Sequence, residues 1–202
     1  MTRRFTAAAL FSALIGFAPA AQALDLNPLT AIKGVIETAV EDRSAEDIAK
    51  DLAIKGKVTA NVIDNLGSDV ISISSDVYEQ IVLLTGAVEK AELKEKAGRL
   101  ARAVQNVKKV HNEIRVVKPV DKKKGVVENY VDDTVIETKI NAQLLDASGV
   151  NVTNFRYRSI GGHVVLFGRA LSKAELKKAL SITKSIDNVV SVKSRVFVRA
   201  KK

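Results

Sequence analysis

The sequence predicts an α+β protein made of two tandem copies of one small domain, and three observations lead to this prediction. Residues 51–86 align with residues 133–168 without a gap. Each copy has apolar residues at helical spacing, followed by short stretches in which apolar and polar residues alternate. Glycine and polar residues separate these stretches, in the order helix, strand, strand, helix, strand.

Ten identical pairs support the alignment of the two copies. They are Asp51 with Asp133, Ile54 with Ile136, Lys57 with Lys139, Ala60 with Ala142, Asp64 with Asp146, Gly67 with Gly149, Val70 with Val152, Val82 with Val164, Leu84 with Leu166, and Gly86 with Gly168. The motif KAEL then recurs at 90–93 and 173–176, and the pair NV recurs at 106–107 and 188–189. Such a match indicates a duplicated domain.

The first copy is predicted to contain a helix near 51–66, strands near 70–74 and 80–85, a helix near 90–104 and a strand near 109–116. In the second copy, Asp132 or Asp133 can cap a helix that ends near Gly149. Strands are predicted at 152–157, 163–167 and 189–198, and a helix that Ser172 caps lies between the last two.

Three strands and two helices per copy predict two layers, with both helices on one face of the sheet and the other face open. The predicted boundaries are 42–117 for the first domain and 132–200 for the second, joined by a linker at 118–131. Residues 24–41 form a separate N-terminal segment.

The N-terminus predicts export. Arg3 and Arg4 precede an apolar stretch at 7–18, and a small-residue site at 21–23 follows, so residues 1–23 are predicted to be a signal peptide cleaved after Ala23. The alternative is a retained anchor, but the apolar stretch is shorter than the roughly 20 residues that span a bilayer. We therefore expect a periplasmic protein, able to associate peripherally with a membrane.

Charge is distributed unequally between the two copies. The formal net charge of +9 falls to +7 when Arg3 and Arg4 are removed, and residues 42–117 hold 12 basic and 12 acidic side chains. Residues 129–202 hold 13 basic and 6 acidic side chains. This asymmetry indicates that the second domain faces an anionic partner, although surplus lysine can also serve solubility alone.

Strand alternation places basic side chains on the predicted open face of the second sheet. If Phe155 and Tyr157 point toward the helices, the residues between them point away. The candidate lipid-binding residues on this face are Arg156, Arg158, Arg169, Lys193, Arg195 and Arg199, with Phe197 among them. The corresponding positions of the first copy show no such basic excess.

The chain resembles the BON domain family of bacterial osmotically inducible and nodulation-related proteins. The resemblance rests on VVLFG at 164–168, LLTG at 83–86, the NV pairs, EDRS at 41–44 and DDTVIETK at 132–139. It covers residues 42–199 and is similar to tandem BON periplasmic proteins and outer-membrane lipoproteins. The lipoproteins carry a cysteine at the cleavage site, whereas Leu24 follows Ala23 here and the chain has no cysteine.

The resemblance implies a non-enzymatic role in envelope integrity under osmotic stress, with binding to phospholipid membranes. It also favours a second candidate surface, at the start of the first helix of the second domain. Its candidate residues are Val135, Ile136, Lys139 and Gln143, next to Thr134. For Val135 and Ile136, packing in the core is an equally good interpretation. Anchoring by Val135 is expected to be weaker than anchoring by an aromatic residue.

Other chemistry has little support in the sequence. His111 and His163 are the only histidines, without a predicted catalytic partner, and no spacing predicts a metal site, a cofactor or a small-molecule substrate. Arginines around an aromatic are also typical of RNA-binding sheets, but export argues against a nucleic acid. The expected partner is therefore an anionic phospholipid membrane. The alternative is a protein-interaction or chaperone-like module acting on envelope proteins.

Overall fold

The computed structural model describes residues 42–67, 72–117 and 125–199. The predicted signal peptide (1–23), the N-terminal segment (24–41) and residues 118–124 of the predicted linker lie outside these residues. Both repeats belong to one compact unit.

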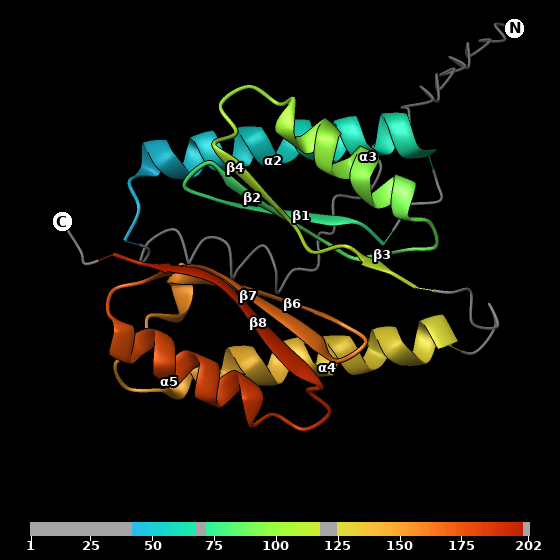
Figure 1. Cartoon of the computed structure of the whole chain (residues 1–202). Helices are drawn as coiled ribbons and strands as arrows, with labels where there is room; N and C mark the ends of the chain where they lie inside the picture. The colour runs from blue at the N-terminus through green and yellow to red at the C-terminus, as the bar shows by residue number, and fades with distance from the viewer. Residues whose placement is uncertain (1–41, 68–71, 118–124, 200–202) are drawn as a thin grey trace, which may run out of the picture. The chain divides into compact units, whose positions relative to one another are not determined.

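The first repeat folds as a helical layer on a small sheet. Helix α2 (Ala45–Leu66) precedes the hairpin of β1 (Ser74–Tyr78) and β2 (Ile81–Thr85). After β3 (Ala87–Val88) and α3 (Ala91–Arg102), the chain forms β4 (Lys109–Asn112) and β5 (Arg115–Val116). Strand β1 is antiparallel and β4 parallel to the central β2, while β3 and β5 form a parallel pair. Helices α2 and α3 lie along one face of the sheet (Figure 1).

The second repeat has the same architecture with longer strands. Helix α4 (Gly125–Asp146) leads through a short 3-10 turn (Val152–Asn154) to the hairpin of β6 (Phe155–Ile160) and β7 (His163–Ala170). Helix α5 (Lys173–Lys184) returns the chain to β8 (Ser191–Val198), which lies parallel to β7. The strand order is β6-β7-β8, and α4 and α5 cover one face (Figure 1). The predicted α+β fold with two tandem αββαβ domains is confirmed.

Four predicted boundaries are wrong by several residues. Helix α2 begins at Ala45 because the Ser44 hydroxyl accepts a hydrogen bond from the backbone N–H of Asp47. Strand β1 begins at Ser74 rather than near residue 70, and β6 begins after the 3-10 turn rather than at residue 152. Helix α4 begins at Gly125, inside the predicted linker.

Asp133 does not cap α4, because its carboxylate binds the turn between β6 and β7. Its two oxygens accept hydrogen bonds from the N–H groups of Gly161 (2.7 Å) and Gly162 (2.9 Å) and from the Ser159 hydroxyl (2.6 Å). The aligned Asp51 does the same in the first domain.

Asp51 accepts hydrogen bonds from the N–H groups of Glu79 and Gln80, both at 2.7 Å. Glu79 and Gln80 have positive φ angles of 50° and 63°, as do Gly161 (59°) and Gly162 (74°). The aspartate that the two repeats share thus fixes a left-handed two-residue turn against the first helix of each domain.

Replacing Asp133 by alanine is expected to lower the free energy of unfolding by about 2–3 kcal/mol, because three hydrogen bonds to a charged acceptor are lost. Asp146→Ala is the matched control, since this exposed carboxylate lies at the end of the same helix. Its replacement should change stability by less than about 0.5 kcal/mol. Urea denaturation measures both values, and equal effects of the two variants would contradict the role assigned to Asp133.

Candidate functional site

The predicted alternation in the second sheet is confirmed. Phe155 and Tyr157 are buried in the core beneath α4 and α5, and Val192 and Val196 pack against the same core. The residues between them therefore point to the opposite face of the sheet.

The prediction that this opposite face is open is wrong, because the sheet of the first domain packs against it. Tyr78, Leu83, Val165 and Phe167 form one buried apolar cluster to which both domains contribute, with Ile81 and Phe197 at its border. The ring centroid of Tyr78 lies 6.5 Å from that of Phe167 and 6.1 Å from that of Phe197, in edge-on geometry. The two sheets thus share an apolar centre.

Ion pairs also link the two domains. Three carboxylates of the first domain, on Asp76, Glu79 and Glu113, face the basic side chains of the second domain. The pairs are Asp76 with Arg158 (2.8 Å), Glu79 with Arg169 (2.9 Å) and with Arg199, and Glu113 with Lys193 (2.8 Å) and with Arg195 (2.7 Å). Five of the six basic candidates on this face are therefore paired across the domain interface.

The sixth basic candidate, Arg156, contacts the backbone and an aromatic ring. Its guanidinium donates to the carbonyl oxygens of Thr153 (2.8 Å) and Phe155 (3.0 Å). The guanidinium carbon also lies 5.7 Å from the ring centroid of Tyr78. Arg156 is therefore part of the same interface.

The electrostatics of the interface favour the charged forms of its partners. Burial alone would raise the pKa of Asp76, but the cations of Arg158 and Lys55 outweigh burial and hold this pKa well below its usual range. Burial would likewise raise the pKa of Glu113, but hydrogen bonds from Lys193 and Arg195 lower it. The carboxylate of Asp76 raises the pKa of Arg158.

Polar contacts at one end of the interface connect the first described residues to both domains. The side chain of Asn154 is fully buried, and its oxygen accepts from the Tyr78 hydroxyl (3.2 Å) while its nitrogen donates to Asp42 (2.9 Å). The Asp42 carbonyl accepts from Arg169 (2.9 Å). Arg43 pairs with Asp51 and stacks over Tyr78.

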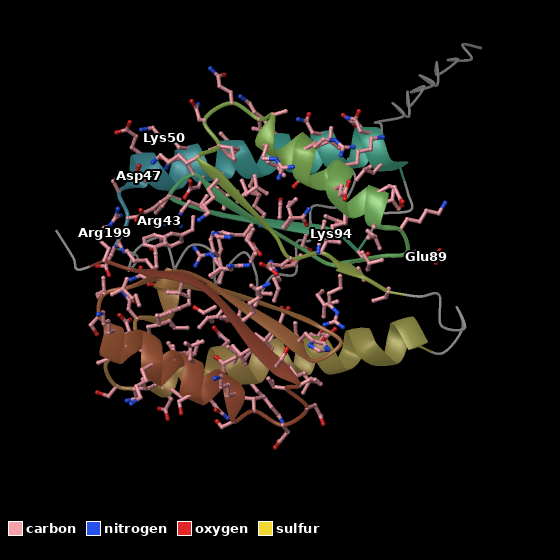
Figure 2. The ribbon with its side chains drawn as sticks, viewed as in Figure 1. Arg43, Asp47, Lys50, Glu89, Lys94 and Arg199 are labelled. Atoms are coloured by element: carbon pink, nitrogen blue, oxygen red, sulfur yellow. The ribbon has the colours of Figure 1, made fainter. Side chains whose placement is uncertain are left out.

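Figure 2 shows Arg43 and Arg199 at the same end of the interface, whereas Asp47 and Lys50 project from α2. Residues 42–43 of the EDRS motif therefore join the two domains.

This arrangement changes the interpretation of the predicted basic surface. Arg158, Arg169 and Arg195 are engaged by carboxylates of the same chain, and Arg169 is only 5% exposed. They are not available to an external anion while the domains are packed. The physical reason is that a second sheet with complementary charge covers the face that alternation predicted to be open.

The second candidate surface, on α4, is accessible. Val135 is 46% exposed and Gln143 is exposed, while Lys139 forms an exposed ion pair with Asp187 at 3.0 Å. Exposed ion pairs of this kind contribute little free energy, so the ammonium group can exchange partners. Ile136 is 2% exposed and belongs to the core, as the packing interpretation predicted. Three of the four candidate residues of α4 thus lie at the surface.

An apolar residue that was not predicted as a site residue is exposed at the same end of the domain. Val190 is 68% exposed, and its N–H donates to the carbonyl of Gly162 at 2.8 Å. The N–H of Gly162 in turn donates to the carboxylate of Asp133 on α4. Comparing the two repeats could have identified this residue, because Val135 and Val190 align with Ala53 and Lys108 in the first copy. Only the second domain has this apolar pair.

The two histidines lie at different places. His111 stands edge-on to Phe167 at 6.3 Å, and burial together with Lys109 lowers its pKa. His163 at the start of β7 contacts the Ser191 hydroxyl at 2.8 Å. Within the described ranges, no group of three or more potential ligands is placed to hold a metal ion.

No helix in the part of the chain that the structure describes is long and apolar enough to cross a membrane.

The two folded repeats match one known family. The model of the BON domain matches residues 50–118 and again residues 132–200, which together make up more than half of the chain. The chain therefore belongs to the BON domain family, as a protein with two tandem BON domains.

Several relatives match most of the chain. Osmotically-inducible protein Y of Escherichia coli (strain K12) is 35% identical over 71% of this chain and 70% of its own. The 21 kDa hemolysin of Actinobacillus pleuropneumoniae is 28% identical over 83% of this chain and 76% of its own. The outer membrane lipoprotein DolP of Haemophilus influenzae is 23% identical over 90% of this chain and 84% of its own.

Proposed function

We propose that this chain is a non-enzymatic protein of the periplasm that maintains the cell envelope under osmotic stress and associates with anionic phospholipid through its second BON domain. The contact surface in this proposal is the exposed face of α4 at Val135, Lys139 and Gln143. The N-terminal export signal expected from residues 1–23 and the name of the outer membrane lipoprotein support the cellular location. The name of osmotically-inducible protein Y supports the role under osmotic stress.

The observation that carries the proposal is the difference between the two faces of the second domain. Its sheet face is engaged by Asp76, Glu79 and Glu113, whereas its helix face exposes apolar and cationic side chains together. Apolar residues beside lysines favour the interface of an anionic bilayer, where each cation near the surface contributes about 1 kcal/mol. In this proposal, the first domain covers the basic face of the second domain's sheet.

Co-sedimentation with vesicles tests the proposal. The expected mature chain, residues 24–202, is mixed with vesicles of phosphatidylglycerol and phosphatidylcholine, or of phosphatidylcholine alone, at low and high salt. Pelleting with the anionic vesicles alone, and its loss at high salt, is the expected result. Absence of pelleting under every condition would refute the lipid partner and direct attention to envelope proteins.

Replacing Val135 by tryptophan is expected to strengthen binding to anionic vesicles about tenfold, because tryptophan buries more apolar surface at the membrane interface. The matched control is Ala53→Trp, at the aligned and exposed position of the first domain. The control should bind vesicles like the unaltered chain. An equal gain in both variants would show that any exposed tryptophan suffices, which contradicts the assignment to α4.

A further inference from the structure

Helix α5 of the second domain exposes lysines and no acidic side chain. Its exposed charged residues are Lys173, Lys177, Lys178 and Lys184. Its one carboxylate, on Glu175, is 5% exposed and accepts hydrogen bonds from the N–H groups of Asn151 (2.8 Å) and Leu171 (2.6 Å). Within the described residues none of the four lysines forms an ion pair. The outer side of α5 is therefore uniformly cationic.

The homologous helix of the first domain is different. Helix α3 has basic residues at equivalent positions, since Lys90 and Lys94 align with Lys173 and Lys177 through the KAEL motif. However, Glu92 and Glu95 lie exposed among them, and Glu95 is paired with Arg99 at 3.9 Å. Two of the four basic residues of α3, which are Lys94, Lys96, Arg99 and Arg102, are thus offset by carboxylates on the helix itself, whereas α5 exposes no carboxylate.

Three of the lysines share one side of α5. Lys173, Lys177 and Lys184 are spaced by four and seven residues, which places them on one stripe of a helix. The stripe lies opposite Ala179 and Thr183, which are fully buried against the sheet. We call Lys173, Lys177 and Lys184 the α5 lysine stripe.

Contacts place α5 beside α4 in one layer. Lys178 donates to the carbonyl of Ser148 just beyond α4 (2.6 Å), and Lys139 of α4 pairs with Asp187 just beyond α5. The two helices therefore run past each other on the same face of the sheet, as Figure 1 shows. The α5 lysine stripe and the α4 surface at Val135 and Lys139 consequently belong to one outer layer.

We propose that the α5 lysine stripe is a second line of contact with an anionic phospholipid bilayer, so that the layer of α4 and α5 lies flat on the membrane. This inference rests on the proposed function. A bilayer fits better than a nucleic acid or an acidic peptide, because the cations are spread along one exposed side of a helix, in the same layer as the exposed Val135 of α4. Widely spaced lysines gain affinity from a continuous anionic surface, about fivefold each.

The test compares the triple variant Lys173→Gln, Lys177→Gln, Lys184→Gln with the unaltered mature chain in the vesicle assay. About a hundredfold weaker binding to phosphatidylglycerol vesicles at low salt is expected, together with a shallower salt dependence. The matched control is Lys90→Gln, Lys94→Gln, Arg102→Gln. It removes the same number of charges from the equivalent helix of the first domain and should bind within about twofold of the unaltered chain.

Each other outcome has a distinct meaning. If the unaltered chain pellets and the α5 variant pellets equally well, the inference is wrong while the proposed function stands with α4 alone. If the control loses as much affinity as the α5 variant, binding follows net charge and the assignment to α5 is wrong. If the unaltered chain does not bind anionic vesicles, both the proposed function and this inference are wrong.

Discussion

Replacing Gly168 by alanine is expected to lower the free energy of unfolding by more than about 4 kcal/mol. An added Cβ atom would lie 2.1 Å from the backbone oxygen of Asn154, and the φ angle of 113° is one that side chains rarely allow. The clash involves the backbone of the 3-10 turn at Asn154, so no side-chain rotation relieves it. The aligned Gly86 has the same environment, with the Ser72 oxygen 2.0 Å from the added atom.

Gly161→Ala is the control that separates the clash from backbone strain. Gly161 also has a positive φ angle, 59°, but an added Cβ atom would meet no atom within 4 Å. We expect a loss of only about 1–2 kcal/mol there. Thermal and urea unfolding measure both variants. A loss for Gly168→Ala no larger than that for Gly161→Ala would contradict the observed packing of β7 against the 3-10 turn.

Replacing Asp76 by alanine is expected to lower the free energy of unfolding by about 3–5 kcal/mol, because the partly buried Arg158 is left without its main partner. The side chain of Asp76 is 6% exposed and also contacts Lys55 at 3.3 Å. Asp64→Ala is the matched control, since Asp64 is exposed on α2 and its loss should cost less than about 0.5 kcal/mol. Equal stability of the two variants would contradict a contribution of this size from the Asp76–Arg158 ion pair to the free energy of unfolding.

The pH dependence of stability should show the same interaction. Folding lowers the pKa of Asp76, so its carboxylate contributes fully to the free energy of unfolding above the unfolded-state pKa of about 3.9. This contribution is lost as the pH falls below that value. The unaltered chain should therefore lose stability steeply below about pH 4. The Asp76→Ala variant should show a shallower decline, and an identical pH profile in both proteins would contradict the assignment.

The secondary structure was largely predictable because two copies of one pattern support each other. Ser172 caps α5 as its position before an apolar stripe predicted, and the Ser172 hydroxyl accepts from the N–H of Glu175 at 3.0 Å. The start of α4 was mispredicted because Asp133 looks like a helix cap from the sequence. Its true partners, Gly161 and Gly162, lie almost thirty residues away, and short-range patterns do not contain that contact.

The candidate site was only partly predictable for a related reason. Alternation along β6 and β8 predicts which side of the sheet a residue faces, and this prediction is confirmed for Arg158 and Arg195. It does not state what covers that side. Of the complementary carboxylates, Asp76 falls outside the strand that the sequence predicted near 70–74, and Glu113 lies in the short connection between β4 and β5. Charge complementarity between the repeats becomes visible only when the register is known.

The closed interface also explains the charge asymmetry between the repeats. Part of the basic excess of the second domain neutralises Asp76, Glu79 and Glu113, and this part holds the two domains together. Among the described residues, the lysines of α5 and Lys139 face outward instead. One sequence feature thus serves two purposes, which the total charge alone does not distinguish.

Labelling at one position tests most directly whether the outer face of the second domain contacts the membrane. The chain has no cysteine, so Gln143→Cys can carry a single environment-sensitive fluorophore, with Asn61→Cys at the aligned position of the first domain as its control. On addition of phosphatidylglycerol vesicles, we expect a blue-shifted, brighter emission from position 143 and an unchanged emission from position 61. A response from position 61 with none from position 143 would contradict the assignment of the membrane surface to the second domain.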